Sequence, residues 1–184
     1  MSAVAEEVQS RTERKNGFLE FLSQNQYDFI RIGYSERKLG EEKVFEIVLK
    51  IARILRGEFG WRDKKVLTAA LLLYVAEESS LTLFEVRTIF GNEVAEIINQ
   101  SKRLLDESRE DFVFRLAKAH PTVLELAAAE ILYRLRTETA RNLEQDDKAR
   151  DIIRAGELKY GPQPDGRFNR IIVSHLNSIL EKKK

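Results

Sequence analysis

Hydrophobic residues recur along most of the chain at spacings of three and four, which is the period of an amphipathic α-helix. This pattern predicts a helix over 17–34 and a second from the acidic pair Glu41 and Glu42 to Gly57. Over 62–78 the apolar residues lie nearly all round the expected helix, which is typical of a buried central helix. No segment of useful length alternates with period two, so we expect an all-α fold of eight or nine helices.

The second half of the chain continues the helical pattern, and local signals mark several helix ends. Thr82 and Glu85 are spaced as a capping box and predict a short helix to Phe90, which Gly91 terminates. Further helices are expected from Asn92, with Leu104 and Leu105 on its apolar face, over 112–119, over 123–139 after Pro121, and over 171–180. Turn signals predict a loop around Gly156, Gly161-Pro162 and Pro164-Asp165-Gly166.

The chain of 184 residues is long enough for one domain with a sizeable core, and it contains no internal repeat or low-complexity linker. The polar segment 1–16 is expected to be flexible, 17–181 to form a single helical domain, and 182–184 to be a basic tail.

Charge and composition exclude several classes of partner and location. The 31 Lys and Arg residues nearly balance the 30 Asp and Glu residues, so we expect no nucleic-acid partner. The longest uncharged run, Val66 to Ala76, has eleven residues, which is shorter than the roughly 18 needed to span a bilayer. The polar N-terminus lacks an apolar signal core and there is no Cys, so a cytoplasmic location is expected.

The chain has only 2 His and 0 Cys, which excludes thiolate zinc sites, cysteine nucleophiles and centres that need three imidazoles. His120 precedes Pro121 and is expected to mark the start of a helix, and His175 is expected to be a packed or surface residue. Catalysis, if present, would depend mainly on carboxylates, hydroxyls, Lys and Arg.

Four segments share an order and a spacing that are characteristic of one family. They are AALLLYVAEES at 69–79, LTLFEV at 81–86, FGNEVA at 90–95 and AEILYRLRT at 129–137. Together they resemble the (p)ppGpp hydrolase domain of the RelA/SpoT family of HD-domain phosphohydrolases, in which the first segment contains an H-D pair and the last an A-D-R triplet. The resemblance covers the chain from Val44 onward and implies an HD-type helical bundle.

The resemblance also implies where a divalent metal, commonly manganese, would be held in the family. The four ligand positions are the His of an H-P pair, the His and Asp of H-D, and the Asp of A-D-R. In this sequence they are occupied by Ile47, Leu73, Tyr74 and Glu130. Because only Glu130 is a ligand of the usual kind, we expect no metal cofactor and no (p)ppGpp hydrolysis.

A second hypothesis for the region around Glu130 is a residual nucleotide pocket. By the resemblance, it would be lined by Glu77, Glu78, Glu130 and Arg134. The simpler interpretation is a solvated surface, because Glu130, Arg134 and Glu138 have the four-residue spacing of an exposed ion-pair ladder worth a few tenths of a kcal/mol per pair.

Three hypotheses for function follow from the sequence. The first is an inactive pseudo-hydrolase that acts as a regulatory, nucleotide-sensing or protein-interaction module, with a guanine nucleotide or a protein as its partner. In this case Leu73 and Tyr74 would fill the old metal site, and a chelator would not change thermal stability. The second is an active phosphohydrolase with a rebuilt carboxylate site and manganese. The third is a structural or oligomerisation domain.

Overall fold

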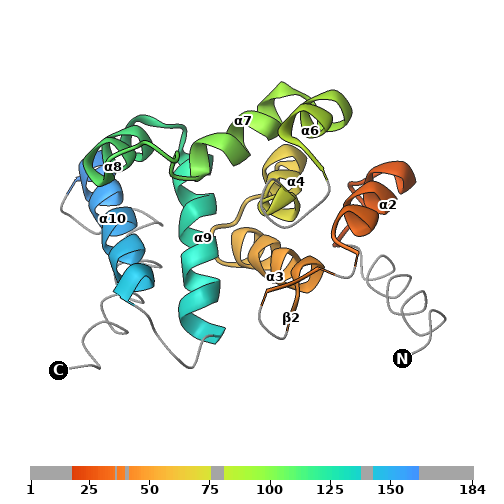
Figure 1. The fold of residues 1–184 in the computed structure, drawn as a ribbon, viewed down its shortest axis with the longest axis horizontal. Helices are drawn as coiled ribbons and strands as arrows, with labels where there is room; N and C mark the ends of the chain where they lie inside the picture. The colour runs from red at the N-terminus through yellow and green to blue at the C-terminus, as the bar shows by residue number, and fades with distance from the viewer. Residues whose placement is uncertain (1–17, 36, 40–41, 76–80, 138–142, 162–184) are drawn as a thin grey trace.

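The computed structural model describes residues 18–35, 37–39, 42–75, 81–137 and 143–161. These residues form eight helices and one two-stranded ribbon, which confirms the all-α prediction (Figure 1). The helices are α2 (Gln24–Gly33), α3 (Val44–Gly57), α4 (Lys64–Leu71), α6 (Leu83–Phe90), α7 (Asn92–Ser101), α8 (Arg109–Lys118), α9 (Pro121–Thr137) and α10 (Leu143–Tyr160). Strands β1 (Lys38–Leu39) and β2 (Glu42–Lys43) pair antiparallel, with Lys38 opposite Lys43. None of the helices so described is long and apolar enough to cross a membrane.

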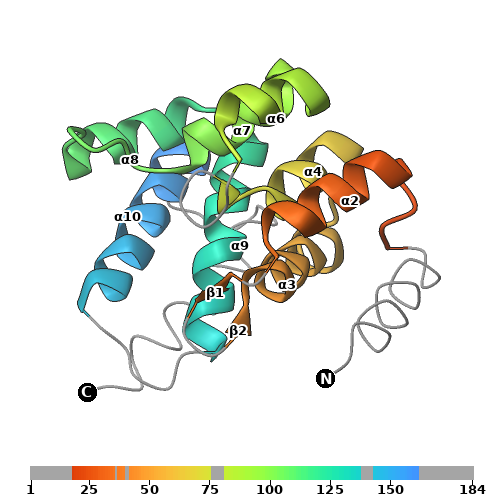
Figure 2. The same ribbon diagram turned by 45° about the vertical axis from the view of Figure 1, so that its right-hand side comes forward.

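Helix α9 is the centre of the domain. It packs against α3 and α4 on one side, against α10 on another, and against α7 and α8 near its beginning (Figures 1 and 2). Every residue from Thr122 to Tyr133 is buried, including the carboxylates Glu125 and Glu130. The small side chains of Ala127 to Ala129 let neighbouring helices approach α9 closely. This part of α9 is therefore enclosed on all sides, although it contains acidic as well as apolar residues.

Helix α2 begins later than the apolar pattern predicts. Ser23 and Gln26 form a capping box, in which the Ser23 hydroxyl accepts from the Gln26 amide and the Gln26 side chain accepts from the Ser23 amide. Leu19 and Leu22, which extended the apparent helical pattern, are buried in the turn before this cap. The predicted start at Gly17 lies outside the described residues, and the helical prediction over 18–23 is wrong.

The capping box at Thr82 and Glu85 is present as predicted. The Thr82 hydroxyl accepts from the Glu85 amide, and the Glu85 carboxylate accepts from the Thr82 amide at 2.8 Å. The helix ends at Phe90 and is followed by Gly91, whose φ of 93° lies in the region that favours glycine. The sequence therefore determines both ends of α6 locally.

Helix α4 is shorter than the predicted span over 62–78. Its regular hydrogen bonding ends at Leu71, and Leu72 to Tyr74 form a turn in which the Leu73 amide donates to Ala70 and the Val75 amide to Leu72. The turn is fully buried and brings the Tyr74 side chain against α9. Residues 76–80, with Glu77 and Glu78, lie outside the described residues.

The prediction that Leu104 and Leu105 continue the buried face of α7 is wrong. The helix ends at Ser101, and the two leucines are exposed. Arg115 on α8 contacts the intervening loop, because its guanidinium donates to the Lys102 carbonyl at 2.7 Å and to the Glu107 carboxylate at 2.6 Å. These bonds hold the loop against α8 in a path that the apolar spacing does not encode.

Helix α10 includes Gly156, where the sequence predicted a loop. Gly156 is buried, and Ala149, Ile152, Ile153 and Ala155 supply the apolar face of the helix. The helix ends at Tyr160, and Gly161 has a φ of 83°. The loop prediction is therefore wrong at Gly156. The remaining turn signals at 162–166 and the predicted helix over 171–180, with His175, lie outside the described residues.

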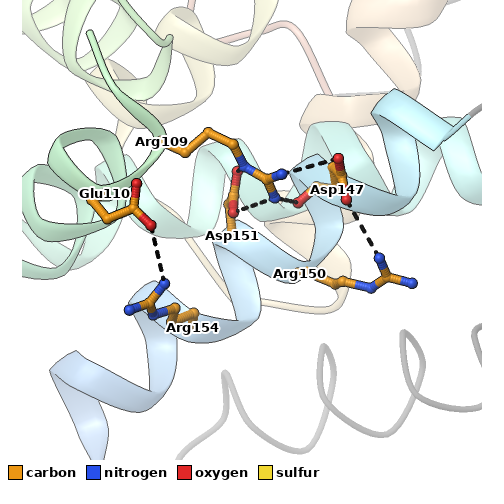
Figure 3. A network of polar contacts seen from close by, with 6 residues as sticks. All are labelled: Arg109, Glu110, Asp147, Arg150, Asp151 and Arg154. Atoms are coloured by element: carbon orange, nitrogen blue, oxygen red, sulfur yellow. Dashed lines mark hydrogen bonds and ion pairs between the residues drawn. The ribbon is translucent and has the colours of Figure 1, made fainter.

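A network of ion pairs joins α10 to α8 (Figure 3). Arg109 donates to the Asp151 carboxylate at 2.8 and 3.1 Å and to the Asp147 carboxylate at 3.0 Å. Arg154 on α10 lies 3.8 Å from the carboxylate of Glu110. Through Asp147 and Asp151, one side of α10 is held against α8.

Candidate functional site

One buried carboxylate lies where four elements meet. Glu130 on α9 is 1% exposed, and Tyr74 reaches it from the turn after α4. Lys148 reaches it from α10, Arg134 lies one turn further along α9, and Lys102 lies directly after α7. We call these five residues the Glu130 cluster.

Hydrogen bonds and ion pairs occupy both oxygens of the Glu130 carboxylate. The Tyr74 hydroxyl donates to Oε1 at 2.9 Å, and the same oxygen lies 3.1 Å from Nη2 of Arg134. The Lys148 ammonium donates to Oε2 at 3.1 Å. The hydroxyl of Tyr74 in turn accepts from Nη2 and Nε of Arg134 at 3.1 and 3.3 Å. The carboxylate is therefore buried, and each of its oxygens is bonded to the protein itself.

Cations also lie over the ring of Tyr74. The ammonium of Lys102 lies 4.4 Å from the ring centroid, and the guanidinium carbon of Arg134 lies 5.6 Å from it. An aromatic ring attracts a cation over its face, so Tyr74 helps to position both basic side chains near Glu130.

The charges in the cluster shift the pKa values of Glu130 and Tyr74 in opposite directions. Burial alone would raise the pKa of Glu130, but Lys148, Lys102, Arg134 and the Tyr74 hydrogen bond outweigh burial and lower this pKa to about 2. Burial, followed by the charge of Glu130, raises the pKa of Tyr74 far above its usual value. At neutral pH the cluster therefore contains an ionised carboxylate and a neutral phenol.

This geometry overturns the interpretation of Glu130 and Arg134 as part of a solvated ladder. The spacing of four residues does bring the two side chains into contact, at 3.1 Å. However, α9 is covered on all sides, so Glu130 is enclosed and only Arg134 reaches the surface, with 26% of its side chain exposed. Spacing predicted the pair but not its burial.

The other predicted site residues lie apart from this contact or outside the described region. Leu73 and Ile47 are buried in the core, on the turn after α4 and on α3. Glu77 and Glu78, the other two residues of the predicted nucleotide pocket, lie outside the described residues. His120 is exposed before α9, and its Nδ1 lies 2.9 Å from the Thr122 hydroxyl, which fits a residue at a helix start.

The residues that the resemblance places at the metal-ligand positions do not fit a divalent ion. Leu73 and Ile47 have no donor atoms, and neutral Tyr74 is a poor ligand. Within the described part of the chain, no three His, Cys, Asp or Glu side chains come together as a metal site would require. The Glu130 carboxylate has cations close to it, which would repel a divalent cation.

Sequence reasoning missed Lys102 and Lys148. A general signal did exist, because a buried carboxylate needs a counter-charge. Which basic residues supply that charge depends on how the end of α7 and the whole of α10 pack against α9, and no local pattern gives that information.

Two open grooves lie elsewhere on the described surface. One, of about 590 Å³, lies between α7 and α8 and includes Leu104, Phe114 and Lys118. The other, of about 340 Å³, includes Phe21, Arg56 of α3, and Lys64 and Leu67 of α4. Neither is lined by a member of the Glu130 cluster.

Comparison with known protein families identifies the family of this chain. The model of the HD domain family matches residues 26–131, more than half of the chain, and the chain therefore belongs to the HD domain family. No curated protein matches the sequence.

Two solved structures share the fold. One is a metazoan ortholog of SpoT, described as hydrolysing ppGpp and acting in starvation responses, with 20% identity, a TM-score of 0.63, and coverage of 90% of this chain and 94% of that one. The other is the protein lmo0812 from Listeria monocytogenes EGD-e, with 22% identity, a TM-score of 0.60, and coverage of 78% of this chain and 99% of that one. The predicted all-α HD-type fold is thus confirmed.

Proposed function

We propose that this HD domain is catalytically inactive and acts as a regulatory module that binds a nucleotide without cleaving it. The observation that carries the proposal is the state of Glu130: both of its oxygens are engaged by Tyr74, Arg134 and Lys148. It is the one carboxylate among the four positions at which the family holds its metal.

Metal-assisted phosphate hydrolysis needs an ion held by several deprotonated donors, because only a firmly bound ion activates water and polarises the phosphate. The Glu130 cluster offers one carboxylate, which is already paired. Tyr74 does not replace the missing carboxylate, since its raised pKa keeps the phenol protonated. These features support a domain that has lost the chemistry and kept the fold.

Arg134 supports the choice of a nucleotide as the ligand. Its guanidinium is fixed by the Tyr74 hydroxyl and by Glu130, and 26% of the Arg134 side chain is exposed. A guanidinium is a group that commonly binds phosphate, because it carries a positive charge and several donors in one plane. The solved structure of the SpoT ortholog suggests ppGpp as the first nucleotide to examine.

The first experiment is an activity assay with ppGpp and Mn²⁺, run beside an active (p)ppGpp hydrolase. We expect no release of pyrophosphate by the protein. Turnover that disappears in the Glu130→Gln variant would overturn the proposal and favour a rebuilt catalytic site.

The second experiment measures binding through thermal unfolding. We expect ppGpp to raise the melting temperature of the wild-type protein, the Arg134→Met variant to lose much of that rise, and EDTA to leave the metal-free curve unchanged. Arg150→Met is a suitable control, because Arg150 is an exposed residue of α10 outside the cluster. A melting curve that no nucleotide shifts would contradict nucleotide binding and favour a structural or protein-binding role.

A further inference from the structure

The Glu130 cluster reverses the arrangement of charge found in a metal centre. In a metal centre a cation is central, and anionic or neutral ligands from several elements surround it. Here an anion is central, and basic side chains approach it from three places: Lys102 after α7, Arg134 on α9 and Lys148 on α10.

Lys148 differs from the other two cations in the element that it brings to the site. It is the contact through which α10 reaches Glu130, at 3.1 Å from Oε2. Its neighbours Asp147 and Asp151 face α8, where they bind Arg109 (Figure 3). Asp147 and Asp151 therefore help to tie α10 to α8, whereas Lys148 ties it to α9.

We infer that Lys148, with Arg134 and Lys102, takes the place of a divalent metal ion as the counter-charge of Glu130, and that this contact holds α10 on α9. The inference goes beyond the proposed function, since it concerns what fixes the last described helix and holds whether or not the domain binds a nucleotide. A buried carboxylate needs a counter-charge in any HD fold that retains it, and here the polypeptide supplies that charge.

A simpler interpretation treats the Lys148 contact as an ordinary surface ion pair. Such pairs contribute little, because both charges stay hydrated and the side chains lose freedom. This pair differs from a surface ion pair because its acidic partner is buried. The Lys148 side chain is 31% exposed, whereas the Glu130 side chain is 1% exposed. Removing Lys148 takes one charge partner from a group that water cannot reach.

The test compares three variants of the full chain by thermal unfolding in EDTA. Lys148→Met removes the charge but keeps much of the aliphatic stem, and we expect a fall in melting temperature of about 4–8 °C. Lys148→Arg keeps the charge, and at least half of the loss should be restored. Arg150→Met, on the same helix and in an exposed pair with Asp147, should change the melting temperature by no more than about 2 °C.

A double variant separates the charge from the packing of the side chain. In Glu130→Gln with Lys148→Met, the two falls in melting temperature should be clearly less than additive, because each substitution removes the same interaction. If Lys148→Met alone does not fold, the inference requires that the double variant folds, because Glu130→Gln removes the unpaired buried charge. Three results would overturn it: Met and Arg variants that are equally unstable, additive losses, or a Lys148→Met variant that melts like the Arg150→Met control.

Discussion

Neutralising Glu130 tests how much its ionised form stabilises the fold. In Glu130→Gln the side chain keeps its shape and an oxygen that can accept from Tyr74, but the charge that attracts Lys148, Arg134 and Lys102 is lost. The two basic groups that contact the carboxylate then lie beside an amide, which pairs poorly with them.

The magnitude follows from the pKa of Glu130. Its fall from 4.5 to about 2 in the folded protein corresponds to about 3 kcal/mol at neutral pH, because each pH unit is worth about 1.4 kcal/mol. This is a large part of the 5–15 kcal/mol that typically stabilises a domain, so the variant should fold but melt about 6–12 °C lower.

Urea unfolding at pH 7 measures this loss directly. The midpoint should fall while the dependence on urea concentration stays the same, since the folded and unfolded states keep their surface areas. Glu93→Gln provides the control, because Glu93 is exposed and pairs with Lys65 on the surface, and it should leave the midpoint unchanged. Equal midpoints for Glu130→Gln and the wild-type protein would refute the reasoning.

Three further predictions test neighbouring features. Tyr74→Phe removes the hydroxyl that bonds Glu130 and Arg134, so the free energy of unfolding in urea should fall by about 1–2 kcal/mol. An unchanged free energy of unfolding would contradict the role of that hydroxyl. Because folding lowers the pKa of Glu130, the stability that its ionised form contributes is complete above about pH 5 and is lost as the pH falls toward 2. Urea midpoints of the wild-type protein should therefore fall more steeply over this range than those of Glu130→Gln. Parallel curves for the two proteins would argue against the lowered pKa. Thr82→Ala removes the N-cap of α6 and should lower the free energy of unfolding by about 1 kcal/mol in the same assay. Thr88→Ala should lower it less, because the Thr88 hydroxyl only donates to a carbonyl within the helix. Equal losses for the two variants would contradict the role of Thr82 as a cap.

Helix positions were predictable where local chemistry and apolar spacing agree. Thr82 and Glu85 fix the start of α6 and Gly91 its end, and Pro121 marks the first residue of α9. In these places the side chain that satisfies the free backbone groups lies within a few residues of them, so the sequence contains the whole interaction.

Predictions failed where a local pattern was taken as decisive: apolar spacing as evidence of helix at Leu19 and Leu22, and a glycine as evidence of a loop at Gly156. Leu19 and Leu22 are buried in a turn, and the capping pair Ser23 and Gln26, visible in the sequence, marks the true start of α2. Gly156 is helical because it is enclosed with Ala155 on a packed face of α10. Tertiary packing outweighs the local cost of glycine in a helix at that position.

The candidate site was predictable only in part. The family motif identified Tyr74, Glu130 and Arg134, and the structure brings these three side chains into contact. Lys102 and Lys148 could not be identified in this way, because they meet Glu130 only through the packing of α7 and α10 on α9. The need for a counter-charge is physical and general, whereas the choice of residue belongs to the tertiary structure.

Calorimetric titration of Mn²⁺ into the metal-free protein tests the central claim most directly. If the protein's own cations have replaced the metal at Glu130, the titration should show no saturable binding, and the melting temperature should be the same with Mn²⁺ as with EDTA. Binding of one ion per chain that is lost in Glu130→Gln would contradict this account.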